Sequence, residues 1–130
     1  MQKPLWRERC LKHPGIMFGK ALRNARTRAK ERSVPFEITR EYIYTLFENQ
    51  DGKCYYSGMQ LSVVKNIKER EHDPLKMTLD CVDPKLGYVA GNIVWCAYCI
   101  NALKLQMSEA EMLNICSEIV TKTTLRGKVL

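Results

Sequence analysis

Residues 78–95, TLDCVDPKLGYVAGNIVW, decide the expected fold because strand and turn signals follow one another closely there. Residues 77–82 alternate apolar and polar side chains, which predicts a half-buried strand. Residues 83–87, DPKLG, are typical of a turn. Residues 89–94 either return as a partner strand or run into a helix, and the pattern from Trp95 to about Gln106 predicts a helix. A hairpin followed by a helix is therefore expected.

Helices are expected on both sides of this hairpin. Residues 16–32 carry apolar side chains at a spacing of three to four, and Thr39 is a plausible N-cap for a helix over residues 40–50. Ser108 and Glu111 form a capping-box pattern that opens a last helix. Its predicted apolar side holds Met112, Leu113, Ile115, Cys116 and Ile119. The fold class is thus α+β, a mostly helical single domain around a hairpin-helix core.

Size and composition exclude several classes of protein. A chain of 130 residues has room for one domain, and its 45% apolar content suits a globular fold. No run of about 18 apolar residues could span a membrane, and the charged first residues lack the apolar core of a signal peptide. We therefore expect no membrane partner, a cytoplasmic location and six reduced cysteines that mostly act as small apolar residues.

The positive charge is concentrated at one end of the chain. Residues 1–32 hold ten Lys or Arg against two Glu, whereas the remaining residues are close to neutral. Such a basic helix attracts phosphate by releasing condensed counterions, so DNA is the leading partner, although a solvated helix that binds nothing specific is the alternative. The candidate DNA-binding residues in this segment are Lys20, Arg23, Arg26, Arg28 and Lys30.

Three stretches in this order resemble the HNH (ββα-metal) endonuclease family, and most closely its small phage-borne members. They are GKCYYSGMQLS at 52–62, TLDCVDPKLGYVAGNIVW at 78–95 and CINALKLQMSEAEM at 99–112. The family's N-terminal features, a basic helix, a Phe-x-Ile-Thr entry and Gln-x-Gly-x-Cys, appear at 23–32, 36–39 and 50–54. The likeness spans about residues 20–120. It implies a basic helical segment at 1–35 and an HNH-like ββα domain with a C-terminal helix at 36–130.

The resemblance also implies an activity and a set of site residues. The family hydrolyses DNA phosphodiester bonds with one divalent ion, Mg²⁺ or Mn²⁺, per site. Asp80 matches the family's metal-binding aspartate, Asn101 its second protein ligand and Asn92 the asparagine that steadies the loop. Asp83 could reach the metal directly or through water. Lys104, one helical turn after Asn101, is expected either to contact a phosphate or to be solvated.

One position departs from the family pattern. The family places a histidine, or in some members an arginine, directly after the metal aspartate, and here that residue is Cys81. A thiol with an ordinary pKa of about 8.5 is a poor general base at pH 7. Candidate substitutes for the base are His72 and one of the tyrosines at 42, 44, 55 or 56.

These observations leave two readings of function. The favoured one is an HNH endonuclease that is encoded by a phage or mobile element and acts in the host cytoplasm. The alternative is a catalytically silent HNH-like protein with a DNA-binding or regulatory role. Cutting both strands would need a homodimer. Structural zinc is not expected, because Ser57 replaces one cysteine of the first pair and the pair Cys96 and Cys99 is shifted by one residue. We expect Cys54, Cys96 and Cys99 to fill core positions instead.

Overall fold

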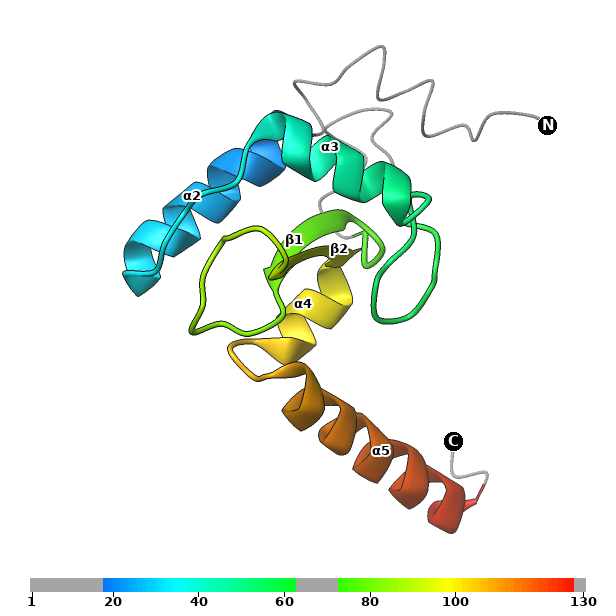
Figure 1. Ribbon diagram of the computed structural model, residues 1–130. Helices are drawn as coiled ribbons and strands as arrows, with labels where there is room; N and C mark the ends of the chain where they lie inside the picture. The colour runs from blue at the N-terminus through cyan, green and yellow to red at the C-terminus, as the bar shows by residue number, and fades with distance from the viewer. Residues whose placement is uncertain (1–17, 63–72, 128–130) are drawn as a thin grey trace, which may run out of the picture.

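The computed structural model describes residues 18–62 and 73–127, which form a small α+β domain. Strands β1 (Met77–Cys81) and β2 (Ile93–Ala97) pair as an antiparallel hairpin. Figure 1 shows helices α2 and α3 on one side of this hairpin, α4 on the other, and α5 extending away from it. The helices are α2 (Lys20–Arg32), α3 (Arg40–Asn49), α4 (Tyr98–Lys104) and α5 (Glu109–Arg126). The expected α+β class is confirmed.

Local chemistry sets the ends of α2 and α3, close to where the sequence predicts them. Ser33 ends α2 in the left-handed conformation, with φ of 54°, and Pro35 follows. Thr39 caps α3, since its hydroxyl accepts a hydrogen bond from the Tyr42 backbone N–H at 3.1 Å. Asp51 then turns the chain with φ of 53°. The predictions for both helices and for the Thr39 cap are confirmed within the described residues.

The hairpin corrects the expected position of the following helix. Trp95 lies in β2 opposite Leu79, and the helix begins only at Tyr98. All five residues of β2 are buried, and an uninterrupted apolar run does not distinguish a buried strand from a buried helix. Residues 93–97 form a strand because they pair with β1. Sequence periodicity does not reveal this pairing. The strand predicted over residues 77–82 is confirmed as β1.

The two faces of β1 point to different surroundings. Leu79 belongs to the core beside α2, and the side chain of Cys81 lies on the same face because alternate residues of a strand share a side. Thr78 and Asp80 point to the opposite face, where α4 packs. Asp80, the candidate metal ligand, and Cys81, which stands where the family has its base, therefore lie on opposite faces of β1.

An aromatic cluster joins the helical layer to the hairpin. The rings of Phe18, Phe47 and Trp95 pack edge to face, with centroids 5.3–5.7 Å apart. The Trp95 indole N–H donates a hydrogen bond to the Ile43 carbonyl at 2.8 Å, so its polar atom is satisfied inside the core. This cluster fixes the hairpin against α3.

The loop between the strands is anchored to the connection between α2 and α3. The Tyr88 N–H donates to the Pro35 carbonyl, and the Glu37 N–H donates to the Tyr88 carbonyl, both at 2.8 Å. Gly87 permits this approach, because a Cβ there would lie 2.8 Å from the Pro35 oxygen and its φ is +77°. The basic helix and the hairpin thus form one packed unit, and the domain boundary expected at residue 35 stays a prediction.

The five cysteines of the described residues are free thiols in different environments. Cys54, Cys81 and Cys96 are buried, as expected for small core residues, and burial raises the pKa of Cys96 to about 12. Cys99 is exposed, so its expected core position is wrong. It lies in the first turn of α4 on the side away from β1, because the spacing that turns Asn101 and Lys104 toward β1 turns Cys99 to solvent.

The last helix, α5, begins as predicted but packs less than predicted. The Ser108 hydroxyl accepts from the Glu111 N–H and the Glu111 carboxylate accepts from the Ser108 N–H, which confirms the capping box. Of the five residues expected on its apolar side, only Met112 is buried. No helix of the described residues is long and apolar enough to cross a membrane.

Candidate functional site

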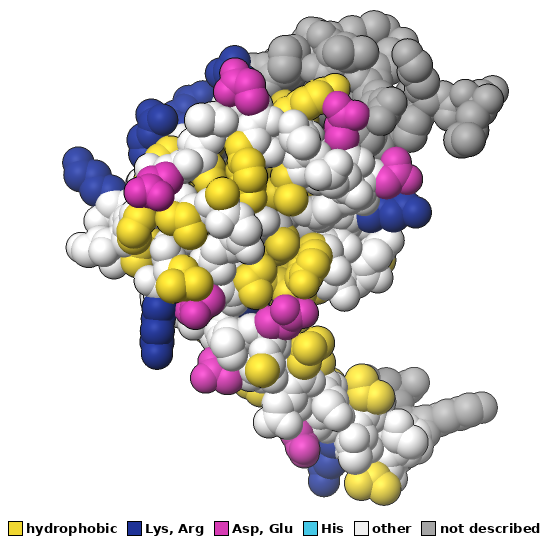
Figure 2. Space-filling view, viewed as in Figure 1, with side chains coloured by type: hydrophobic (Ala, Val, Ile, Leu, Met, Phe, Trp, Pro, Cys, Tyr) yellow, Lys and Arg dark blue, Asp and Glu magenta, His cyan; other side chains and the backbone are white. Residues whose placement is uncertain are grey.

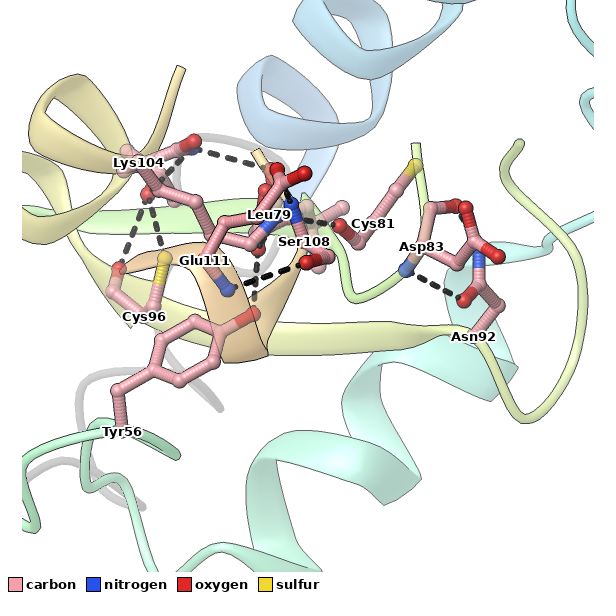
Figure 3. Close-up of polar contacts among 12 residues, drawn as sticks. Tyr56, Leu79, Cys81, Asp83, Asn92, Cys96, Lys104, Ser108 and Glu111 are labelled. Carbon is pink, nitrogen blue, oxygen red and sulfur yellow. Dashed lines mark hydrogen bonds and ion pairs between the residues drawn. The ribbon is translucent and has the colours of Figure 1, made fainter. Parts of the chain in front are cut away.

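Asp80 lies at the centre of a buried cluster of polar side chains. Its Oδ2 accepts a hydrogen bond from the Tyr56 hydroxyl at 2.6 Å and forms an ion pair with the Lys104 Nζ at 3.2 Å. Tyr56 comes from the turn after α3 and Lys104 from α4, and Figure 3 shows the two side chains converging. Asp80 is 5% exposed and Lys104 is fully buried. Residues far apart in sequence thus meet at one carboxylate.

Lys104 neutralises this carboxylate and does not face solvent. Its ammonium also donates to the Cys81 carbonyl at 2.9 Å, so two hydrogen-bond acceptors of β1 hold it. The expectation that Lys104 contacts a phosphate or is solvated is therefore not supported. A lysine is buried this completely only when a partner compensates its charge, and Asp80 supplies that compensation.

Asn101 lies one turn before Lys104 and faces the same strand. Its Nδ2 donates to the Thr78 hydroxyl at 3.1 Å and to the Leu79 carbonyl at 3.3 Å. Because both nitrogen contacts point to β1, the Oδ1 of Asn101 is left without a hydrogen bond from the described residues. α4 therefore brings Asn101 and Lys104 along β1, with Asp80 at the same face.

Asn92 and Asp83 act together in the hairpin loop, as Figure 3 shows. The Asn92 Oδ1 accepts from the Asp83 N–H at 3.0 Å, and its Nδ2 donates to the carbonyls of Asp83 and Gly87 at 2.9 and 2.7 Å. The Asp83 carboxylate accepts from the Lys85 N–H at 3.0 Å and so closes its own turn. These contacts of Asn92 tie the two ends of the hairpin loop together, and the Asp83 carboxylate serves its own turn.

Neither Cys81 nor Tyr56 is arranged as a general base. Cys81 is 3% exposed, and burial, with the charge of Asp80, raises the pKa of its thiol to about 11. Burial and the hydrogen bond to Asp80 raise the pKa of Tyr56 well above its usual range. The Tyr56 hydroxyl therefore stays protonated as a hydrogen-bond donor to Asp80 and does not act as a base. The Tyr42 hydroxyl accepts a hydrogen bond from the Gly91 N–H at 2.8 Å, in the hairpin loop. His72 lies outside the described residues.

Two oxygen atoms at this cluster suit a hard divalent cation. No described residue donates a hydrogen bond to the Asp80 Oδ1, although the Asp80 side chain is buried. The Oδ1 of the half-buried Asn101 also accepts no hydrogen bond from a described residue. Carboxylate and amide oxygens are the ligands that Mg²⁺ takes, with water at its other positions. In residues 18–62 and 73–127 no group of three His, Cys, Asp or Glu could bind a metal. These two atoms are the candidate oxygen ligands of the site, and the Lys104 Nζ lies 3.2 Å from the other Asp80 oxygen.

Four basic side chains of α2 remain exposed. Lys20, Arg23, Arg26 and Lys30 face solvent, and in Figure 2 the Lys and Arg side chains gather along the edge where α2 lies. Arg28 differs, because its guanidinium donates to the Tyr88 hydroxyl at 2.9 Å and to the Leu79 carbonyl at 3.0 Å. Arg28 thus joins α2 to β1, while the other four basic side chains stay at the surface of the helix.

The partly buried contacts of Arg28 and the exposure of Arg23 predict different effects for substitutions at these two positions of α2. Arg28→Ala is expected to lower the free energy of unfolding by about 2–3 kcal/mol, because two charge-assisted hydrogen bonds are lost. Arg23→Ala is expected to change it by less than about 0.5 kcal/mol and to weaken DNA binding, with the salt slope reduced by about one. Urea unfolding and fluorescence anisotropy with duplex DNA at several salt concentrations measure these effects. Equal stability of the two variants would contradict the structural role of Arg28.

Sequence reasoning identified most of this cluster but not its connections. Tyr56 was among four tyrosines considered as a base, yet it acts as the hydrogen-bond donor to Asp80. Thr78, whose hydroxyl accepts a hydrogen bond from the Asn101 Nδ2, is not marked by the sequence as a residue of the site. The spacing of three between Asn101 and Lys104 predicts that both side chains lie on one helical face, and both do contact β1.

Comparison with protein-family models, with curated proteins and with solved structures finds no match to this chain. The function of the chain is therefore inferred from its residues and their geometry.

Proposed function

We propose that this chain is an HNH-type endonuclease that binds DNA and hydrolyses its phosphodiester bonds with one divalent metal ion. The observation that carries the proposal is the placement of Asp80 on β1 beside Asn101 on α4, each with an oxygen that accepts no hydrogen bond from the described residues. A strand-loop-strand-helix order with an aspartate on the first strand and an asparagine on the helix is what the family resemblance implies. We also propose that the chain is encoded by a phage or a mobile element.

In this proposal the chain's own residues divide three tasks. Lys20, Arg23, Arg26 and Lys30 bind the DNA backbone, which makes affinity fall steeply with salt. Asp80 and Asn101 would hold Mg²⁺ or Mn²⁺, and a bound ion would polarise the scissile phosphate and stabilise the leaving oxygen. Tyr56 and Lys104 hold the Asp80 carboxylate in position through its other oxygen.

A second candidate function is a catalytically silent HNH-like domain that binds DNA without cutting it. Two observations favour it. The Lys104 ammonium already compensates the charge of Asp80, and Cys81 is buried with a raised pKa on the face away from that carboxylate. Without a base the same scaffold still presents its basic helix to DNA.

A supercoiled-plasmid nicking assay with Mg²⁺ or Mn²⁺, run beside EDTA, separates the two functions. Asp80→Asn is expected to reduce nicking about a hundredfold or more, because an electrostatic contribution of several kcal/mol is removed. Asp83→Asn is the matched control, since the amide oxygen can still accept from the Lys85 N–H and nicking should stay near the wild-type rate. Circular dichroism verifies that both variants fold.

The outcomes are distinct. Metal-dependent nicking that Asp80→Asn removes and Asp83→Asn preserves supports the endonuclease. Plasmid binding without nicking favours the silent DNA-binding domain. Nicking that is equal in all three proteins would exclude Asp80 from the mechanism and would indicate a contaminating nuclease.

A further inference from the structure

The surface of α5 is unusually apolar for a helix that extends from its domain. Beyond Met112, which packs against the rest of the protein, the apolar side chains are open to solvent (Figure 2). Leu113 is 52% exposed, Ile119 53% and Val120 65%. Monomeric proteins rarely leave a continuous apolar stripe of this kind uncovered.

Three exposed residues and the half-buried Cys116 follow the spacing of a helix-pairing seam. Leu113, Cys116, Val120 and Thr123 recur at intervals of three, four and three, so they lie along one face of α5. Ile119 flanks the same face. Asn114 and Glu118 lie on the opposite face, at 100° per residue. The seam residues have no cover among the described residues, although the opposite side also carries an exposed apolar residue, Leu125, seven positions after Glu118.

The charges of α5 select the orientation of a partner helix. Glu109 lies at the first residue of α5 on the seam side and Arg126 at its last residue beside the seam, whereas Glu111 and Lys122 lie on the Glu118 side and face away from it. A second α5 running antiparallel would place its basic end beside the acidic end of the first. A parallel copy in register would place like charges together. The charge pattern is thus complementary to itself in the antiparallel sense.

We propose that two copies of this chain associate through an antiparallel α5–α5 pair related by a two-fold axis near residue 118. In this pair, Cys116 of one copy lies opposite Val120 of the other, and the ends bring Glu109 near Arg126 of the second copy. The contact is isologous, as expected for a symmetric dimer. One helix pair buries less than a standard interface, so the dimer is weak and concentration-dependent.

The first test is the oligomeric state of the full chain. Sedimentation velocity over a range of micromolar concentrations is expected to show a monomer–dimer equilibrium for the wild type. Val120→Glu should weaken association about tenfold or more, because a charge enters the apolar seam. Asn114→Glu is the matched control, since it adds the same charge on the opposite face and should associate as the wild type does.

The second test fixes the orientation. In the Val120→Cys variant, mild oxidation is expected to yield a covalent dimer that Cys116→Ser removes, because the introduced thiol lies opposite the partner's Cys116. A parallel pair would join the two introduced thiols to each other and would be insensitive to Cys116→Ser.

Three results would overturn the proposal. They are a wild type that stays monomeric at all concentrations, equal effects of the charges at 114 and 120, and a parallel cross-linking pattern. A monomeric wild type that Val120→Glu destabilises would instead indicate that the chain covers this face itself. None of these measurements involves DNA or metal, so they stand apart from the nuclease proposal.

Discussion

Replacement of Lys104 by methionine is expected to lower the free energy of unfolding by about 3–5 kcal/mol, the range observed when one partner of a buried ion pair is removed. Methionine approximates the volume of the lysine stem, so the loss reports on charge more than on packing. The variant leaves the Asp80 carboxylate buried with only the Tyr56 hydroxyl as partner and also deprives the Cys81 carbonyl of a donor. Urea unfolding followed by circular dichroism measures the loss.

The control is the double variant Asp80→Asn with Lys104→Met. Neutralising both partners removes the uncompensated charge, so the double variant should be clearly more stable than Lys104→Met alone. If Lys104→Met costs less than about 1 kcal/mol, the pair is worth no more than a surface ion pair and the buried cluster does not hold Asp80 in place.

The same variant tests the divalent cation without measuring activity. With the ammonium gone, Mg²⁺ or Mn²⁺ is the remaining counter-charge available to Asp80, and an ion that binds only the folded state stabilises it by mass action. Lys104→Met should therefore gain more stability from Mg²⁺ than the wild type does. An equal response in the two proteins would favour the catalytically silent function, in which Lys104 permanently takes the place of the ion.

Elements whose limits are set by local chemistry were predictable from the sequence. Thr39 and the pair Ser108 and Glu111 cap their helices with side chains that are three residues from the groups they bind. The alternation in residues 77–82 placed β1 correctly. These signals are complete within a short window, so they do not depend on how the chain folds around them.

Features that depend on distant partners were not predictable. The run from Ile93 to Ala97 is apolar throughout, and only its pairing with β1 shows that Trp95 belongs to a strand. A helix lysine is solvated by default, and nothing near Lys104 in the sequence indicates that Asp80, 24 residues earlier, compensates its charge. Periodicity likewise predicted an apolar side for α5 without revealing that most of it stays exposed. Burial of charge and exposure of apolar surface are properties of the packed chain.

The hairpin loop offers the second large effect, through the nearly isosteric substitution Asn92→Asp. The wild-type amide donates to two carbonyls and accepts one N–H, and all of this takes place at 7% exposure. Aspartate keeps the acceptor but replaces the donor with an oxygen facing the Asp83 and Gly87 carbonyls. Loss of two hydrogen bonds and burial of an unpaired charge should lower the free energy of unfolding by about 3–5 kcal/mol at pH 7.

Acid should partly rescue this variant, which distinguishes the effect of charge from a loss of packing. Burial beside two carbonyl oxygens raises the pKa of the introduced carboxyl in the folded state above its unfolded value. The folded variant then binds the proton more tightly, so its deficit relative to the wild type is largest above the folded pKa and shrinks as the pH falls through it. Asn92→Ala, which introduces no charge, should show a deficit that does not change with pH. A deficit for Asn92→Asp that is equally independent of pH would mean that the loop opens and lets water reach residue 92, and the loop would then be too weakly held to orient the strand that carries Asp80.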